Sequence, residues 1–307
     1  MVIDGRKIAE ELLVELKKLP KPEKFLAVVM VGEDPASESF VGQKEKVARE
    51  LGVDFRIYRF PVDASQDALR KEVLKITEHK TCGGVVVQLP LPAAVNKQYV
   101  LNAIPREKDV DVLGERALGA FYAGRNLVLP PAVGVLNEII RRLFPLGTGR
   151  SSAPAAEAVL RSRPQDATGD QALASSESFR SETAAVLLKD KKVAVVGLGF
   201  LVGKPIATWL AGKCAEIFAL DLGSDFNILK DADVVISGAG KAGILKPEML
   251  KNDALVIDFG YSFVDGKISG DFDASSSSSL AYTPTPGGTG PILVAKLFEN
   301  FYKLAIL

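Results

Sequence analysis

The sequence predicts an α/β protein built from two domains, each with a parallel sheet. At 307 residues the chain is longer than a single hydrophobic core usually holds, so two domains of ordinary size are expected. Segments with helical periodicity alternate with short apolar runs. Because these runs are continuously apolar, they are typical of parallel strands that are covered on both faces.

The first part of the chain predicts three strands separated by helices. Apolar residues at helical spacing before Pro20 indicate a helix, and Phe25–Val31 indicates a buried strand. The elements that follow are a helix over 36–51, a strand over 55–60, a helix around 68–77 and a strand over 84–88. We assign residues 1–125 to this domain, completed by 285–307, which contains an apolar helix over 292–304.

The composition changes after residue 144. Residues 147–181 are rich in Ser, Ala, Gly and Pro with little periodicity, which predicts a mobile surface insertion rather than a third domain. The second domain, residues 126–284, has predicted strands over 192–197, 216–221, 233–237 and 254–258, with a helix over 204–211. The serine run 275–279 predicts another loop.

Charge and composition exclude several classes of function. Lys plus Arg and Asp plus Glu both number 38, so no overall positive field favours a nucleic acid. No apolar run approaches the ~20 residues that cross a bilayer. The N-terminus lacks the features of a secretory or transit peptide. We therefore expect a cytoplasmic protein with no nucleic-acid or membrane partner.

The cysteines and the histidine do not predict a metal site. Cys82 and Cys214 are far apart, and His79 is the only histidine, so neither a zinc ligand set nor a disulfide framework is indicated. We interpret both cysteines as small apolar residues. His79 follows a helical pattern among charged neighbours, which favours a surface position.

Lys44 is the residue that most strongly indicates chemistry. It lies within the apolar face of the helix predicted over 36–51, among Phe40, Val41, Val47, Ala48 and Leu51. An ammonium on the core side has its pKa lowered by desolvation, which suits proton transfer. The alternative is that the stem lies on apolar surface while the amine reaches water.

A glycine motif in the second domain predicts a nucleotide site. An apolar strand runs into Gly197, Gly199 and Gly203, and a helix follows, so a pyrophosphate can approach the helix N-terminus. Asp221, at the end of the next strand, can accept bonds from ribose hydroxyls and would repel a 2′-phosphate, which favours NAD over NADP. The alternative is a purely structural turn.

Polar residues also follow the last strand of the first domain. Gln88 ends this strand, where ligands of parallel sheets bind, although a strand-end amide can instead satisfy loop backbone. Asp109 and Asp111 lie in a loop further on, and loop acids often only cap or turn the chain. Thr283–Ile292 combines prolines and glycines before the last helix and predicts a loop that lines a ligand.

Together these segments resemble the bifunctional methylenetetrahydrofolate dehydrogenase/cyclohydrolase family of the FolD type. The resemblance spans nearly the whole chain except the insertion, and the ordered set of motifs is highly specific. The matching segments are residues 31–44, 84–92, 107–111, 195–205, 256–260 and 286–291.

The resemblance implies a catalytic domain, a Rossmann-like domain for NAD(P), a folate substrate and a homodimer. Such enzymes transfer a hydride from methylenetetrahydrofolate to the nicotinamide and then hydrolyse the methenyl product to formyltetrahydrofolate. It implies that Lys44 is catalytic, that Gln88 is its partner and that Asp111 grips the pterin. The implied substrate-binding residues are Phe40, Pro286, Gly287 and Gly288. The implied cofactor-binding residues are Gly197, Leu198, Gly199, Gly203, Asp221, Gly238 and Thr285.

Three departures from the family pattern bear on activity. Phe40 stands where the family usually has tyrosine, so one hydroxyl is missing near Lys44. Leu129–Ala132 replaces a Pro-Cys-Thr-Pro motif, and Leu198–Gly199 replaces Arg-Ser, which removes a positive partner for a 2′-phosphate. Most bifunctional relatives use NADP. The alternatives to a bifunctional enzyme are a dehydrogenase without hydrolase activity and a catalytically weak binding protein that regulates a partner.

Overall fold

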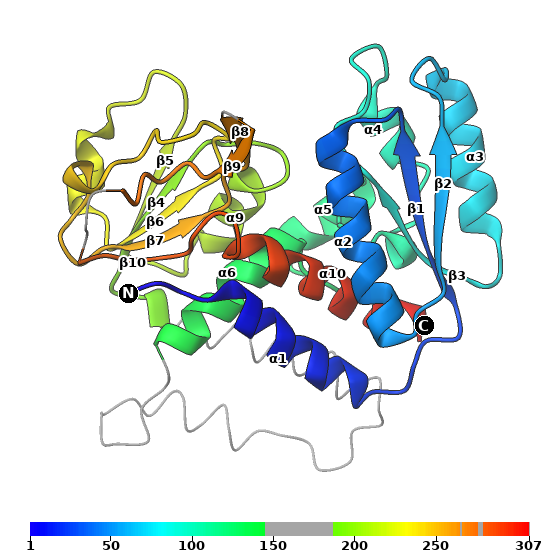
Figure 1. Ribbon diagram of the computed structural model, residues 1–307, viewed down its shortest axis with the longest axis horizontal. Helices are drawn as coiled ribbons and strands as arrows, with labels where there is room; N and C mark the ends of the chain where they lie inside the picture. Colours follow the sequence, from blue (N-terminus) through cyan, green and yellow to red (C-terminus); the bar gives the residue numbers. More distant parts are fainter. Residues whose placement is uncertain (145–186, 265, 276–278, 307) are drawn as a thin grey trace. The chain divides into compact units, whose positions relative to one another are not determined.

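The chain divides into two compact units in the computed structural model (Figure 1). The structure describes residues 1–144, 187–264, 266–275 and 279–306, so the predicted insertion at 147–181 lies outside the described residues, as does most of the serine run. The first unit comprises Asp4–Ala132 and Gly287–Leu307, and the second comprises Met1–Ile3 and Val133–Pro286.

The first unit contains a parallel sheet of three strands in the order β2-β1-β3. These strands are β1 (Phe25–Val31), β2 (Phe55–Phe60) and β3 (Cys82–Val87). Every residue of β1 and β3 is buried, as the sequence predicted. Strand β2 instead consists of half-buried and exposed residues.

Helices and the C-terminal segment complete the first unit. They are α1 (Gly5–Lys17), α2 (Pro35–Leu51), α3 (Gln66–Glu78), α4 (Lys97–Leu101), η1 (Arg106–Lys108), α5 (Glu115–Tyr122) and α10 (Thr289–Ala305). Helix α10, red in Figure 1, packs along α1. Its Phe298 and Phe301 are fully buried in a core that they share with Leu26 and Val28 of β1. The last helix therefore belongs to the first unit, as predicted.

Local sequence signals fix both ends of α2. Asp34 caps its N-terminus by accepting a hydrogen bond from the Ser37 amide at 2.8 Å, and Pro35 occupies the first turn. Gly52 ends the helix in the left-handed conformation, with φ 68°. With both ends fixed, the apolar face of α2 is held against the core, and Lys44 with it.

The second unit contains a parallel sheet of five strands in the order β10-β7-β6-β4-β5 (Figure 1). The strands are β4 (Lys192–Val196), β5 (Glu216–Leu220), β6 (Val234–Ser237), β7 (Leu255–Asp258) and β10 (Ala281–Tyr282). The helices are α6 (Pro131–Leu143), α9 (Gly203–Leu210), η2 (Phe226–Asp231) and η3 (Pro247–Met249). The strand order reverses direction between β4 and β6, which is where open parallel sheets bind ligands.

Several elements of the second unit were not predicted from the sequence: the helices α6, η2 and η3 and three short strands. Strand β10 extends the sheet beyond β7, and β8 (Ser262–Val264) and β9 (Lys267–Ser269) form an antiparallel hairpin. These strands are two or three residues long and half-buried or exposed, so they carry no apolar pattern. The predicted α/β class with two parallel sheets is confirmed.

The histidine and the two cysteines, for which the sequence predicted no chemical role, lie outside any cluster of reactive groups among the described residues. His79 is exposed, as predicted, with its ring edge-on to Phe25. Cys82 is buried and Cys214 half-buried, both as free thiols. Among the described residues no cluster of three or more His, Cys, Asp or Glu side chains is arranged to hold a metal ion. No described helix is both long and apolar enough to span a bilayer.

Candidate active site

Lys44 is buried in the first unit, with only 5% of its surface exposed. It lies on α2 between Val41 and Ala48, which are buried on the same face. Desolvation lowers the pKa of the Lys44 ammonium below its ordinary value, and the negative charge of Asp111 opposes this shift. The side chain therefore does not reach bulk water, which excludes the alternative that the sequence left open.

Gln88 holds the amine of Lys44. The Lys44 Nζ donates a hydrogen bond to the Gln88 Oε1 at 2.9 Å, and the Gln88 Nε2 donates to the carbonyl of Leu89 at 2.9 Å. Gln88 follows β3 directly, and its backbone amide bonds to Val29 of β1. Because its amide nitrogen is used by Leu89, its oxygen is presented to Lys44. The side-chain amide of Gln88 therefore bonds both to the loop backbone and to Lys44.

Asp111 supplies the acidic group of this cluster. Its side chain is half-buried, burial raises its pKa, and the charge of Lys44 lowers it again. The next residue, Val112, is the one described non-glycine residue with a positive φ, 57°. A β-branched residue is strained in this conformation, and such strain persists only where the surrounding structure enforces it.

Asp109 enforces that turn. Its buried carboxylate accepts hydrogen bonds from the amides of Leu113 and Gly114, at 3.0 and 2.7 Å, and its backbone bridges to Val85 of β3. Burial raises the pKa of Asp109 to about 7. The two loop acids therefore have different roles: Asp109 shapes the turn, and Asp111 acts electrostatically on Lys44.

Phe40 lies one helical turn before Lys44 on α2 and is half-buried. Residues four apart on a helix share a face. The aromatic ring therefore adds an apolar surface on the Lys44 side of α2 and no hydroxyl.

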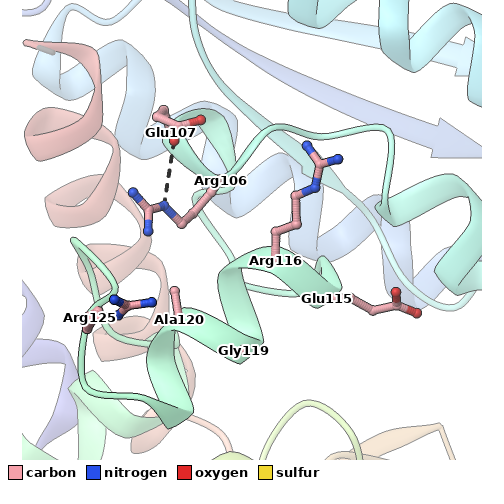
Figure 2. Close-up of a pocket in the computed structure, with 7 residues that line it drawn as sticks. All are labelled: Arg106, Glu107, Glu115, Arg116, Gly119, Ala120 and Arg125. Atoms are coloured by element: carbon pink, nitrogen blue, oxygen red, sulfur yellow. Dashed lines mark ion pairs between the residues drawn. The ribbon is translucent and has the colours of Figure 1, made fainter.

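A separate pocket of about 410 Å³ lies in the first unit around α5 (Figure 2). Its charged lining consists of Arg106, Arg116, Arg125, Glu107 and Glu115, and no residue of the Lys44 cluster lines it. Arg106 pairs with Glu107 at 3.6 Å, and the side chains of Arg116 and Glu115 point away from that pair. Its charges are thus mixed rather than focused on one ligand.

The glycine motif of the second unit forms a tight turn between β4 and α9. Gly197 has φ 82°, and a Cβ there would lie 2.6 Å from the backbone of Ala239. A Cβ on Gly203 would lie 1.9 Å from the carbonyl oxygen of Gly197. At Gly199 the nearest protein atom to a Cβ would be 3.9 Å away, so packing does not require glycine there. Close approach of a ligand is a second physical reason for glycine in a turn of this kind.

The other predicted cofactor residues lie at the same edge of the sheet. Leu198, in the turn itself, is half-buried, and Asp221 is exposed immediately after β5. Gly238 follows β6, and a Cβ there would lie 2.8 Å from Val202. Thr285 follows β10, with its hydroxyl 2.8 Å from the Cβ position of Gly270. A backbone-lined edge of this kind fits a dinucleotide, whose phosphates bind to main-chain amides.

The predicted folate loop is held at the start of α1. Gly287 has φ 100° and lies beside Arg6, whereas Pro286 is exposed. The carbonyl oxygen of Gly288 would lie 1.7 Å from a Cβ on Gly5. The structure therefore groups Lys44, Gln88 and Asp111 in one cluster, holds Gly287 and Gly288 against α1, and carries the glycine turn in the second unit.

The sequence did not single out two buried acids of the second unit, Asp258 and Asp271. Asp258 accepts hydrogen bonds from the amides of Gly260 and Phe272, at 2.6 and 3.0 Å. Burial raises the pKa of Asp258 to about 6. The available signal was a pair of glycines, because Gly270 leaves room for the carboxylate of Asp258 and Gly260 leaves room for that of Asp271.

Comparison with known proteins identifies the family. Residues 3–111 match the family model "Tetrahydrofolate dehydrogenase/cyclohydrolase, catalytic domain", and residues 180–306 match the corresponding NAD(P)-binding domain. The bifunctional protein FolD of Halothermothrix orenii is 32% identical, over 98% of this chain and 96% of that protein.

Solved structures agree with this match. The bifunctional FolD enzyme of Campylobacter jejuni is 26% identical with a TM-score of 0.79, over 100% of this chain and 98% of that one. The FolD enzyme of Trypanosoma brucei, complexed with NADP cofactor and inhibitor, is 26% identical with a TM-score of 0.80, over 100% of this chain and 97% of that one. The resemblance read from the motifs is confirmed: the chain belongs to the tetrahydrofolate dehydrogenase/cyclohydrolase family.

Proposed function

We propose that this chain oxidises methylenetetrahydrofolate to methenyltetrahydrofolate and then hydrolyses the product to formyltetrahydrofolate, with Lys44 as the group that manages protons. The observation that carries this proposal is the buried Lys44 amine, which bonds to Gln88 and faces the charge of Asp111. Membership of the family supplies the two reactions and the substrate class.

For the oxidation the chain mainly supplies positioning. When bound, NAD(P) would supply the acceptor for the hydride of the methylene carbon. Holding the donor carbon in a reactive geometry can contribute ~7 kcal/mol or more without any acid or base. We assign Asp111 to the pterin ring, Gly287 and Gly288 to the folate-lining loop, and the glycine turn to the nucleotide phosphates.

For the hydrolysis the chain supplies a tunable base. Water attacks the methenyl carbon and must lose a proton, and the ring nitrogen must gain one as the C–N bond breaks. Because burial lowers its pKa, the Lys44 ammonium releases a proton more readily than an exposed lysine does, and the hydrogen bond to Gln88 fixes the direction of the amine. This chemistry requires neither histidine nor a metal ion.

The test is a paired assay of Lys44→Met. We expect the rate of methenyltetrahydrofolate hydrolysis, measured as the loss of its absorbance, to fall by about 10²-fold or more. This is the usual effect of removing a general acid–base residue. Nucleotide affinity should stay unchanged. Lys46→Met is the matched control, because Lys46 is exposed on the same helix. Hydrolysis at the wild-type rate in Lys44→Met would remove this lysine from the mechanism.

We further propose that NAD is preferred over NADP. The support is the exposed carboxylate of Asp221 after β5, together with Leu198 where relatives carry arginine. Replacing Asp221 by Ser should shift preference towards NADP by ~1–3 kcal/mol, because a charge that repels the 2′-phosphate is removed. Asp225→Ser, at another exposed acid nearby, is the control. A wild-type enzyme that already favours NADP contradicts this assignment.

Phe40 favours a second candidate, a dehydrogenase with weakened hydrolase activity, because no hydroxyl lies one turn before Lys44. Hydride transfer with normal rates but without methenyl hydrolysis identifies it. Absence of both reactions instead leaves a regulatory binding protein. The family resemblance also leads us to propose a homodimer, and light scattering of the purified chain measures this directly.

A further inference from the structure

Asp271 is a fully buried carboxylate in the second unit, and its side chain accepts hydrogen bonds from the end of β6 and from the loop that follows it. Its Oδ2 accepts bonds from the Ser237 hydroxyl at 2.6 Å and from the amides of Ala239 and Gly240 at 2.8 and 3.3 Å. Its Oδ1 accepts a bond from the amide of Lys241 at 2.7 Å. Because a buried charge is stable only when such donors surround it, three consecutive amides are fixed around this one group.

The loop that Asp271 holds, residues 238–241, follows β6 and packs against the glycine turn. A Cβ at Gly197 would lie 2.6 Å from the Cα of Ala239 and 2.7 Å from its amide nitrogen. On the other side, Val202 would lie 2.8 Å from a Cβ on Gly238. With so little space between the two backbones, a shift of this loop must displace the glycine turn.

The position of Asp271 is itself tightly fixed. Its carbonyl accepts a hydrogen bond from the amide of Leu245 at 2.9 Å, and the carbonyl of Gly270 accepts one from Gly243 at 3.1 Å. A Cβ on Gly260 would lie 2.3 Å from its carboxylate, so glycine is needed there to make room. Because the carboxylate is held rigidly, it also fixes the position of the loop that bonds to it.

We propose that Asp271 is a positioning residue for the nucleotide: through loop 238–241 it holds the glycine turn in the conformation that accepts the dinucleotide. This rests on the proposed placement of NAD(P) at the carboxyl ends of β4 and β6. Asp271 acts through the loop rather than by touching the ligand, because its two oxygens are already occupied by four protein donors.

The charge matters as much as the shape. In Asp271→Asn, one carboxylate oxygen becomes an amide nitrogen that donates, so at least one of the four donors meets another donor. A bond to a charged group is also stronger than one to a neutral group. Asp273→Asn is the matched control, because Asp273 lies two positions along the same segment, is half-buried and accepts a hydrogen bond from the Ser275 amide.

The experiment compares the wild type, Asp271→Asn and Asp273→Asn. In Asp271→Asn we expect the nucleotide KM of hydride transfer and the nucleotide Kd from titration without folate to rise about ten- to a hundredfold. Hydrolysis of methenyltetrahydrofolate uses no nucleotide and should be unchanged. Amide hydrogen exchange at residues 239–241, measured without ligands, should accelerate. Asp273→Asn should match the wild type in all four measurements.

Each other outcome has a definite meaning. Unchanged nucleotide affinity in Asp271→Asn overturns the proposal, as does a parallel loss of hydrolysis, which would assign Asp271 a general structural role. Should Asp271→Asn fail to fold, Ser237→Ala removes a single donor, and an unchanged nucleotide Kd there also overturns the proposal. A wild type that binds neither NAD nor NADP contradicts the proposed function itself, before any variant is compared.

Discussion

A buried amine destabilises a folded protein to the extent that burial lowers its pKa. Lys44 meets this description, because desolvation is the larger influence on its pKa and the opposing charge of Asp111 the smaller. An apolar residue at the same position on α2 would pack among Val41 and Ala48 without that cost. Packing alone would therefore favour an apolar residue at this position, and the proposed proton transfer gives a reason for lysine.

Lys44→Met should stabilise the protein at neutral pH by about 0.5–2 kcal/mol, the usual gain when a functional residue is replaced by one that suits its site. In the wild type, the unfolded chain binds a proton that the folded Lys44 holds less tightly. Stability therefore rises with pH between the lowered folded-state pKa and the ordinary lysine pKa of about 10.4, and the variant lacks this rise.

Denaturant unfolding across this pH range measures the difference. Lys46→Met, on the exposed side of α2, should show no such pH-dependent gain. The account is wrong if Lys44→Met is less stable than the wild type throughout the range, because the vacated Gln88 would then cost more than the buried amine.

At the scale of single residues, the sequence predicted what periodicity can reveal. Lys44 was found because its neighbours on α2 are apolar at helical spacing. Local pattern could not distinguish Asp109 from Asp111, because they share one loop and differ only in their partners, and only the family resemblance singled out Asp111. Asp271 was missed because its donors lie 30 to 34 positions away along the chain, where no local pattern connects them.

Among the elements, the turn between β4 and α9 contains glycines that are present for two different physical reasons. Gly203 is required by the fold, because a Cβ would lie 1.9 Å from the carbonyl oxygen of Gly197. Gly199 has no such constraint, with its nearest protein atom at 3.9 Å. The same motif therefore contains one position set by packing and one that we assign to the ligand.

Alanine substitution should separate these two roles. Gly203→Ala should lower the free energy of unfolding by about 1–3 kcal/mol, because the turn must shift to relieve overpacking. Gly199→Ala should leave stability nearly unchanged and weaken nucleotide binding. Thermal unfolding and nucleotide titration of both variants provide the measurements. Equal loss of stability in the two variants would show that Gly199 is also structural.

The predicted bounds of the longer strands agree with the structure to within two residues. The predicted bounds of β1 and β2 are exact, and those of β5, β6 and β7 differ by one residue at one end. The hairpin β8–β9 and strand β10 were missed because hydrogen-bonding neighbours, rather than their own apolar content, define them. Strand β10 nonetheless matters, since Thr285 follows it.

In the whole molecule, each unit uses the same device: side chains or backbone collected at the carboxyl ends of a parallel sheet. In the first unit this edge carries Gln88 after β3, and in the second it carries Gly197 and Gly238 after β4 and β6. The length of the chain predicted two domains, and the composition break after residue 144 predicted an insertion. The positions at which the chain passes from one unit to the other, after Ile3, Ala132 and Pro286, have no signal in the amino-acid composition.

Nucleotide binding should therefore stabilise the molecule without involving Lys44. At about 100 times its Kd, the preferred nucleotide should raise the free energy of unfolding of the second unit by about 2.7 kcal/mol. Calorimetry with and without nucleotide measures this, and Lys44→Met should show the same increment. An increment lost in Lys44→Met would mean that the lysine contributes to the nucleotide site.

The contact between Gly5 and Gly288 has a consequence for how this sequence can change over time. The two glycines come from nearly opposite ends of the chain, yet the carbonyl oxygen of one occupies the place where a methyl group on the other would stand. Neither of these two positions can then change independently of the other. A substitution at position 5 becomes acceptable only after the backbone before α10 has moved, so the two positions should covary among descendants of this protein.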